Sequence, residues 1–166
     1  MTAIDAKYLK LNHIPENWVE ERLGDFVLYE KGKKPKVLVK QQNEEYKYPY
    51  INIKAFEQKV FTEFSNGLSG VMCSEEDFLL VWDGARSGLV GKGIAGLVGS
   101  TLAKINFPGI YNMYAYYYLK SKYHEINTNA KGTGIPHVNP DLLWNYRFPI
   151  PPLAEQHRIV EKIEEL

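Results

Sequence analysis

The sequence of 166 residues contains only one cysteine, Cys73, so no disulfide can form within the chain. Its few histidines and this cysteine do not cluster at the spacing of a zinc site. No apolar run reaches the about 18 residues that a membrane-spanning helix needs, and the N-terminal MTAIDAKYLK lacks the apolar core of a signal peptide. We therefore expect a cytoplasmic protein with no zinc and no membrane anchor.

An excess of charge of either sign is also missing, because 20 lysine and arginine residues balance 20 acidic residues. This balance excludes a chain coated in positive charge, but charges segregated on one face can still bind nucleic acid. The stretch EKGKKPKVLVK is locally basic, with Glu30 as its only acid. Its five lysines are Lys31, Lys33, Lys34, Lys36 and Lys40. We expect a loop here, since Gly32 and Pro35 interrupt regular structure.

Hydrophobic patterning predicts one domain that mixes strands and helices. Strands are expected over YPYINIKAF (48–56), DFLLVWDG (77–84) and STLAKINF (100–107), with an extended piece over LLWNYRFPIPP (142–152). Apolar residues recur at helical spacing over 111–126, which predicts one helix there. Two prolines precede LAEQHRIVEKIEEL, as is typical of the start of a helix, and its apolar stripe predicts an amphipathic helix.

The stretch WDGARSGLVGKGIAG contains a literal G-x-G-x-x-G at Gly91, Gly93 and Gly96. A dinucleotide site needs such a loop to lead directly into a helix, with an acidic residue about 20 positions further on. Here LVGSTLAKINF follows, which is a poor helix sequence, and no acidic residue occurs between Gly96 and Glu125. We therefore interpret the glycines as tight turns and close approaches between strands rather than as a nucleotide site.

A metal-dependent nuclease is the enzymatic alternative. Asp25 is followed by a Glu-x-Lys at Glu45 and Lys47. Two carboxylates can hold Mg²⁺ and a lysine can position the attacking water. The plainer interpretation is that Glu45 and Lys47 lie in a solvated loop, because a Glu-x-Lys arises by chance in any charged chain.

The order of the segments IPENWVEERLGDF, YPYINIKAF, LLVWDGARSGLVG, STLAKI and GTGIPHVNPDLLWNYRFPIPPLAEQHRIVEKIEEL resembles a target recognition domain of type I restriction–modification specificity subunits. The closing PPLAEQHRIVEKI is the most specific part. The resemblance covers the chain from Ile14 onward. It divides the chain into a leader (1–13), a recognition domain (14–150) and the start of a spacer and dimerisation helix (151–166).

The resemblance implies an α/β (α+β) fold, in which a mixed-sheet domain is followed by the start of a long spacer helix. It implies no catalysis by this chain and no cofactor or metal of its own. Such subunits bind double-stranded DNA and read half of a two-part target with each recognition domain. They recruit modification subunits, which methylate adenine with S-adenosylmethionine, and restriction subunits, which translocate and cut DNA.

Base readout requires a side chain on a rigid support that reaches the major groove. Arg86 is the strongest candidate, because it follows a buried strand and an arginine can contact guanine O6 and N7 together. Phosphate and further polar contacts are expected from lysines and loop residues. These are Lys31, Lys33, Lys34, Lys36, Lys92, Lys131, Thr133, His137 and Asn139. The plainer alternatives are a structural ion pair for Arg86, solvated or connecting loops for the lysines and Thr133, and a structural hydrogen bond for His137.

The apolar stripe of the last helix consists of Ile159, Val160, Ile163 and Leu166. The resemblance implies that spacer helices pair as an antiparallel coiled coil, so the stripe is expected to pair with a second half-subunit or to pack on its own domain. Only one recognition domain is present, and the helix reaches the last residue. The chain is therefore expected to be a half-subunit, a piece of a longer one, or a remnant that competes with an intact specificity subunit.

Overall fold

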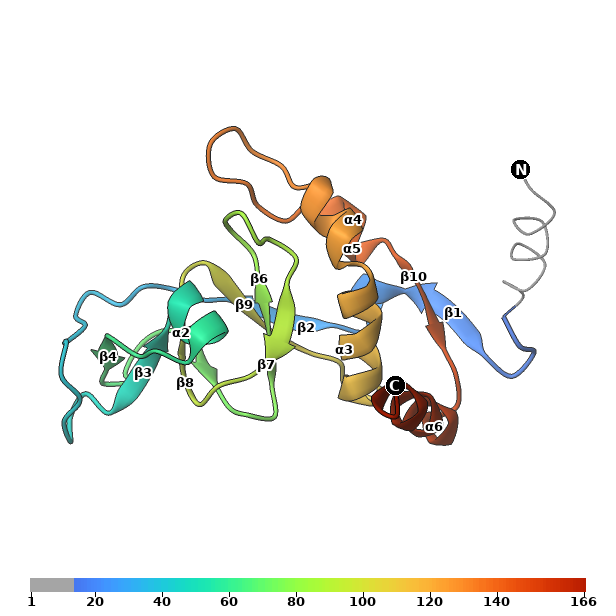
Figure 1. Ribbon diagram of the computed structural model, residues 1–166, viewed down its shortest axis with the longest axis horizontal. Helices are drawn as coiled ribbons and strands as arrows, with labels where there is room; N and C mark the ends of the chain where they lie inside the picture. The colour runs from blue at the N-terminus through green and yellow to red at the C-terminus, as the bar shows by residue number, and fades with distance from the viewer. Residues whose placement is uncertain (1–13) are drawn as a thin grey trace.

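The computed structural model describes residues 14–166, so the predicted leader (1–13) lies outside the described residues. Figure 1 shows a central sheet with a second sheet on one side and helices on the other. A two-stranded sheet of β1 (Val19–Arg22) and β10 (Arg147–Ile150) lies beyond the helices, beside the C-terminal helix. Strands and helices are mixed throughout, as predicted for an α+β fold.

The central sheet is antiparallel and has the strand order β2-β9-β6-β7. Its strands are β2 (Leu28–Lys31), β9 (Leu102–Asn106), β6 (Phe78–Val81) and β7 (Val90–Lys92). The strands predicted over 77–84 and 100–107 are confirmed as β6 and β9. All four residues of β6 are buried, because alternate side chains enter two different hydrophobic clusters. Burial on both faces explains the unbroken apolar run FLLV.

The second sheet has the order β4-β3-β8-β5 and mixes parallel and antiparallel pairs. Its strands are β3 (Tyr48–Ile51), β4 (Phe64–Ser65), β5 (Met72–Cys73) and β8 (Gly96–Val98). The predicted strand over 48–56 is wrong in its second half, which forms helix α2 (Ile53–Gln58). The Asn52 side chain accepts the Ala55 N–H at 2.9 Å and so caps the start of α2.

Helices cover the other face of the central sheet. The single helix predicted over 111–126 is interrupted: α3 (Asn112–Ser121) ends at Lys122, and α4 (Tyr123–Thr128) begins after it. Both contribute to the larger core cluster, where Leu119 and Ile126 are fully buried. The extended piece predicted over 142–152 is wrong at its start, because α5 (Pro140–Trp144) continues through those residues before β10.

The last helix, α6 (Leu153–Glu164), is confirmed and packs against α3. Gln156 is buried at its first turns, where its Oε1 accepts the Tyr111 N–H at 2.8 Å and its Nε2 donates to the Pro151 carbonyl at 2.9 Å. Val160 is only 2% exposed and belongs to the core of the domain. The helix is therefore docked on its own domain through one side.

Candidate nucleic-acid interface

Three segments that are distant in sequence meet at one end of the central sheet, where β2 and β6 end and β9 begins. The N–H groups of Trp82 and Asp83 both donate to the Thr101 carbonyl, and the Gly84 N–H donates to the Pro136 carbonyl at 2.8 Å. Figure 1 shows the turn after β6 and the loop before α5 on the same side of the molecule. We call this surface the loop face and define it as residues 31–36, 82–88 and 131–137.

The turn that joins β6 to β7 displays Arg86. Gly84 and Gly88 have φ angles of +112° and +95°, which glycine adopts at no steric cost. The Gly88 N–H donates to the Val81 carbonyl at 2.7 Å and closes the turn. The Arg86 side chain is 61% exposed, and its Nη1 lies 2.9 Å from Glu57 Oε1 at the end of α2. Arg86 is thus an accessible guanidinium that one carboxylate contacts.

The other two segments of the loop face carry lysines. Lys31 pairs with Asp83 at 2.6 Å, and Lys131 lies 3.7 Å from the Asp141 carboxylate. Lys33, Lys34 and Lys36 are exposed in the loop that follows β2. Positive groups from three segments are therefore presented together, although carboxylates accompany several of them.

Stacked aromatic side chains pack at the start of the β6–β7 turn. The Tyr29 ring stacks on Trp144 at 4.8 Å between ring centroids and on Trp82 at 5.9 Å. Trp82 begins the turn, and its carbonyl accepts the Val138 N–H. These contacts link both loops to the core, so the loop face has the rigid support that base readout needs.

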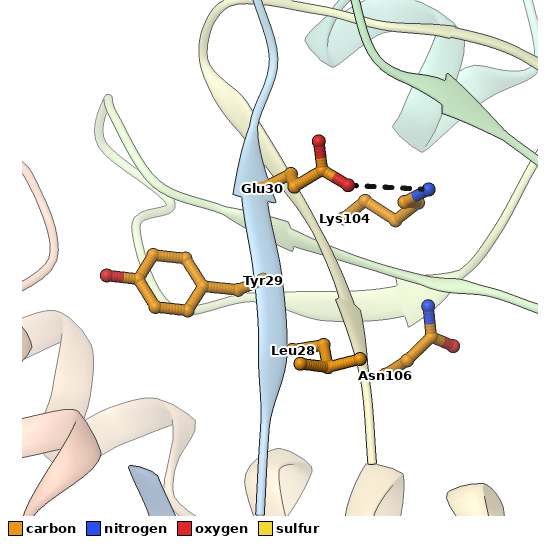
Figure 2. A pocket seen from close by; sticks show the side chains of 5 residues that line it. All are labelled: Leu28, Tyr29, Glu30, Lys104 and Asn106. Atoms are coloured by element: carbon orange, nitrogen blue, oxygen red, sulfur yellow. Dashed lines mark ion pairs between the residues drawn. The ribbon is translucent and has the colours of Figure 1, made fainter. Parts of the chain in front are cut away.

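Two hollows lie near these groups. One, of about 330 Å³, adjoins Arg86 and is lined by Ile53, Val81, Asp83, Gly84, Ala85 and Thr101. The other, of about 270 Å³, lies along the edge strand β2, where Leu28 and Glu30 point toward Lys104 and Asn106 while Tyr29 points the opposite way (Figure 2). Lys104 Nζ is 4.0 Å from Glu30 in this second hollow. The first hollow lies directly beside the Arg86 side chain.

The remaining predicted DNA contacts differ in position. Thr133 is exposed on the loop before α5. His137 is half-buried and exchanges two backbone hydrogen bonds of 2.8 Å with Lys131. Asn139 caps α5, since its Oδ1 accepts the N–H groups of Asp141 and Leu142. Asn139 therefore has a structural task whatever else it contacts.

Lys92 lies at the opposite end of the sheet from Arg86, because β7 pairs Lys92 with Phe78 at the start of β6. At that end the Asp77 carboxylate accepts the Ser74 N–H and an Asn106 amide N–H, each at 2.8 Å. Burial alone would raise the pKa of Asp77, but these hydrogen bonds and Lys104 lower it below the ordinary value. Burial raises the pKa of the neighbouring Cys73 thiol to about 11, so this thiol is protonated at neutral pH.

The nuclease alternative is not supported. Asp25 pairs with Arg22 at 2.9 Å between β1 and β2, whereas the exposed Glu45 lies in a turn just before β3. Figure 1 shows β1 and β3 at opposite sides of the molecule. Among residues 14–166, no three His, Cys, Asp or Glu side chains are grouped so that they could hold a metal ion. The glycine-rich stretch forms β7 and β8, and so does not lead into a helix that could hold a pyrophosphate.

The two carboxylates that accompany the main basic groups could not be recognised from sequence patterns. Glu57 and Asp83 are paired with Arg86 and Lys31 only through the tertiary fold.

In the part of the chain from residue 14 onward, no helix is both long and apolar enough to cross a bilayer.

The chain is an α+β domain with basic loops at one end of its central sheet. Residues 15–166 match the family model described as the type I restriction modification DNA specificity domain, and the chain belongs to this family. It is 36% identical over 155 residues to the type I restriction enzyme MjaVIII specificity subunit of Methanocaldococcus jannaschii, covering 92% of this chain and 36% of that subunit.

Solved structures show the same fold. The HsdS subunit from Thermoanaerobacter tengcongensis superposes with a TM-score of 0.71 at 21% identity, over 92% of this chain and 38% of that one. A chain from a study of complex assembly and conformational transition of the type I R-M system gives a TM-score of 0.74 at 20% identity, over 98% of this chain and 42% of that one. The chain thus spans well under half the length of the relatives it matches.

Proposed function

We propose that this chain is a non-catalytic specificity subunit or half-subunit that binds one half of a two-part duplex DNA target. The observation that carries the proposal is the loop face, where Arg86, Lys31 and Lys131 come together from three segments on a rigid support. Arg86 reads a base edge, and the lysines of residues 31–36 contact phosphates, which position the domain without specifying sequence.

The proposed partners are a modification subunit and a restriction subunit, with DNA in the cytoplasm as the ligand. This part of the proposal is supported by family membership and by the relative that is a type I restriction enzyme specificity subunit. The proposed units are the recognition domain, residues 14–150, and the start of a spacer helix, residues 151–166.

Pairing with a second half-subunit is proposed for those side chains of the last-helix stripe that the domain leaves exposed. Val160 is buried in its own domain and Ile159 is partly buried against it, so these two side chains do not remain for a partner. Ile163 is 36% exposed and Leu166 is fully exposed. The proposed pairing surface therefore includes Ile163 of α6 and Leu166 beyond the end of α6, rather than the whole stripe.

The test is a genome-wide map of N6-methyladenine in the source organism with and without this gene. The proposal predicts that methylation of one two-part motif disappears with the gene. If no motif changes, the chain does not supply specificity, and a remnant that competes with an intact specificity subunit becomes the better account. A remnant would bind a partner subunit but no duplex.

A further inference from the structure

The Arg86–Glu57 pair joins the loop face to helix α2 at its edge. The two side chains come from different elements, the β6–β7 turn and the last turn of α2. Their Nη1 and Oε1 atoms are 2.9 Å apart, and the glutamate is the less exposed of the two, at 23% against 61%. A donor and an acceptor are thus held side by side at a fixed spacing, next to the hollow of about 330 Å³.

A base pair presents the same spacing in its major groove. In a G·C pair the guanine O6 accepts a hydrogen bond from the cytosine N4–H, so these two atoms lie about 2.9 Å apart. The O6 atom has a further lone pair, and N4 has a further hydrogen, that face the groove. An arginine N–H and a carboxylate oxygen at matching distance complete a ring of four hydrogen bonds with this edge.

We propose that Arg86 and Glu57 act as one unit that reads a single base pair in a fixed orientation, with Arg86 on the keto base and Glu57 on the amino base. This inference rests on the proposed function and adds Glu57 as a specificity-determining residue. Neither charge is left unpaired on binding, because each keeps its partner and gains one contact with the base pair.

The chemistry predicts a ranking of the four base pairs. A G·C pair with guanine in contact with Arg86 is preferred, because guanine N7 offers the guanidinium a second acceptor. Thymine comes next, since O4 accepts but N7 is missing. The reversed C·G and A·T pairs are rejected, because an amino group then faces Arg86 and a carbonyl oxygen faces Glu57. A phosphate contact by Arg86 would predict no ranking at all.

The test uses the full chain and duplexes selected by it from a random pool. Each G·C pair of the selected motif is replaced in turn by the other three pairs, and by guanine opposite N4-methylcytosine. That base keeps the pairing hydrogen but carries a methyl group where the groove-facing N4–H would be. The proteins compared are wild type, Arg86→Ala, Glu57→Ala and, as a matched control, Glu20→Ala, which removes a similar pair with Arg147 at the other side of the molecule.

At one G·C position, we expect wild type and Glu20→Ala to lose about fivefold or more in affinity for the methylated cytosine. Glu57→Ala should show no such loss, and Arg86→Ala should lose the preference for guanine at that same position. The inference is overturned if duplex binding persists but no position shows a methyl effect that Glu57→Ala abolishes. It is also overturned if Glu57→Ala raises affinity equally on all sequences, since Glu57 would then only shield Arg86 from phosphate. Failure of wild type to bind any duplex would overturn the proposed function as well.

Discussion

The two ends of the β6–β7 hairpin differ in what they do with their polar groups. At the loop face, glycines with positive φ form a turn that holds Arg86 out toward solvent. At the other end, Gly93 is buried and its N–H donates to the Asp77 carbonyl at 2.7 Å, while Asp77 gathers hydrogen bonds from Ser74 and Asn106. At the loop face the charged Arg86 side chain is exposed to solvent. At the other end, which we call the fastened end, the charged Asp77 side chain is used in hydrogen bonds that hold neighbouring segments together.

This difference explains the glycine-rich stretch. A Cβ on Gly93 would lie 2.2 Å from the Ser74 carbonyl oxygen, and one on Gly96 would lie 2.4 Å from that of Pro49. These glycines permit close backbone approach, whereas Gly84 and Gly88 permit an unusual backbone conformation. Glycine therefore allows close packing of the backbone at the fastened end, and it allows the turn that exposes Arg86 at the loop face.

The largest expected effect comes from breaking the fastened end with Gly93→Ala. Because the added methyl group meets backbone atoms of Ser74 and Asp77 that cannot rotate away, we expect a loss of about 3 kcal/mol in the free energy of unfolding. Urea denaturation measures it. The control is Gly91→Ala, whose methyl group meets the Phe56 side chain rather than backbone atoms and should cost less. Equal losses for both variants would contradict this account of Gly93.

At the loop face, replacing Lys33, Lys34 and Lys36 by alanine should weaken duplex binding equally on all sequences. Each lost phosphate contact removes about one counterion from the binding equilibrium, so the slope of log K against log salt should fall by about 3. Binding titrations at several salt concentrations measure the slope. Lys92→Ala is the control and should leave the slope unchanged. A comparable change in slope for Lys92→Ala would mean that DNA also contacts the fastened end, which would contradict the prediction.

Arg86→Ala distinguishes base contacts from phosphate contacts within the loop face. If Arg86 reads a base edge, this variant loses about 1–3 kcal/mol of discrimination at one base pair and retains it at the others. Competition binding with duplexes that differ at single positions measures the change. A uniform loss on all sequences would show that Arg86 contacts only phosphate.

The smallest effect is a pH dependence at the fastened end. The pKa of Asp77 is lowered in the folded state, so its contribution to stability is complete above the unfolded pKa of about 3.8 and is lost as the pH falls through the folded value. Asp77→Asn should remove this part of the acid sensitivity, which we expect to be below about 1 kcal/mol because solvent screens the partly exposed carboxylate. Urea denaturation between pH 7 and pH 3 compares the two proteins. Parallel curves would contradict the prediction.

The strongest local patterns predicted the fold best. The apolar run of β6 and the amphipathic stripe of α6 are local signals, and both elements are confirmed. Helix α2 was missed because Ile51 and Ile53 favour a strand, although Asn52 was a visible capping residue. Helix α5 was missed in the same way, even though Asn139 followed by Pro140 is a typical helix start.

The candidate site depended more on the fold than on the sequence. Arg86 and Lys31 were visible as basic residues, but their pairing with Glu57 and Asp83 is created by contacts between distant segments. Lys92 is close to Arg86 in sequence, yet the hairpin places them at opposite ends because its two strands are antiparallel. Sequence spacing therefore cannot tell which charges share a surface.

The central claim is that the Arg86 end of the hairpin faces DNA and the Lys92 end does not. The most direct measurement is the set of backbone amide NMR shifts of the full chain during titration with duplex DNA. The account predicts that shift changes concentrate in residues 31–36, 82–88 and 131–137 and at Glu57, and are absent from residues 92–95. Changes centred on residues 92–95, or spread evenly over the chain, would contradict it.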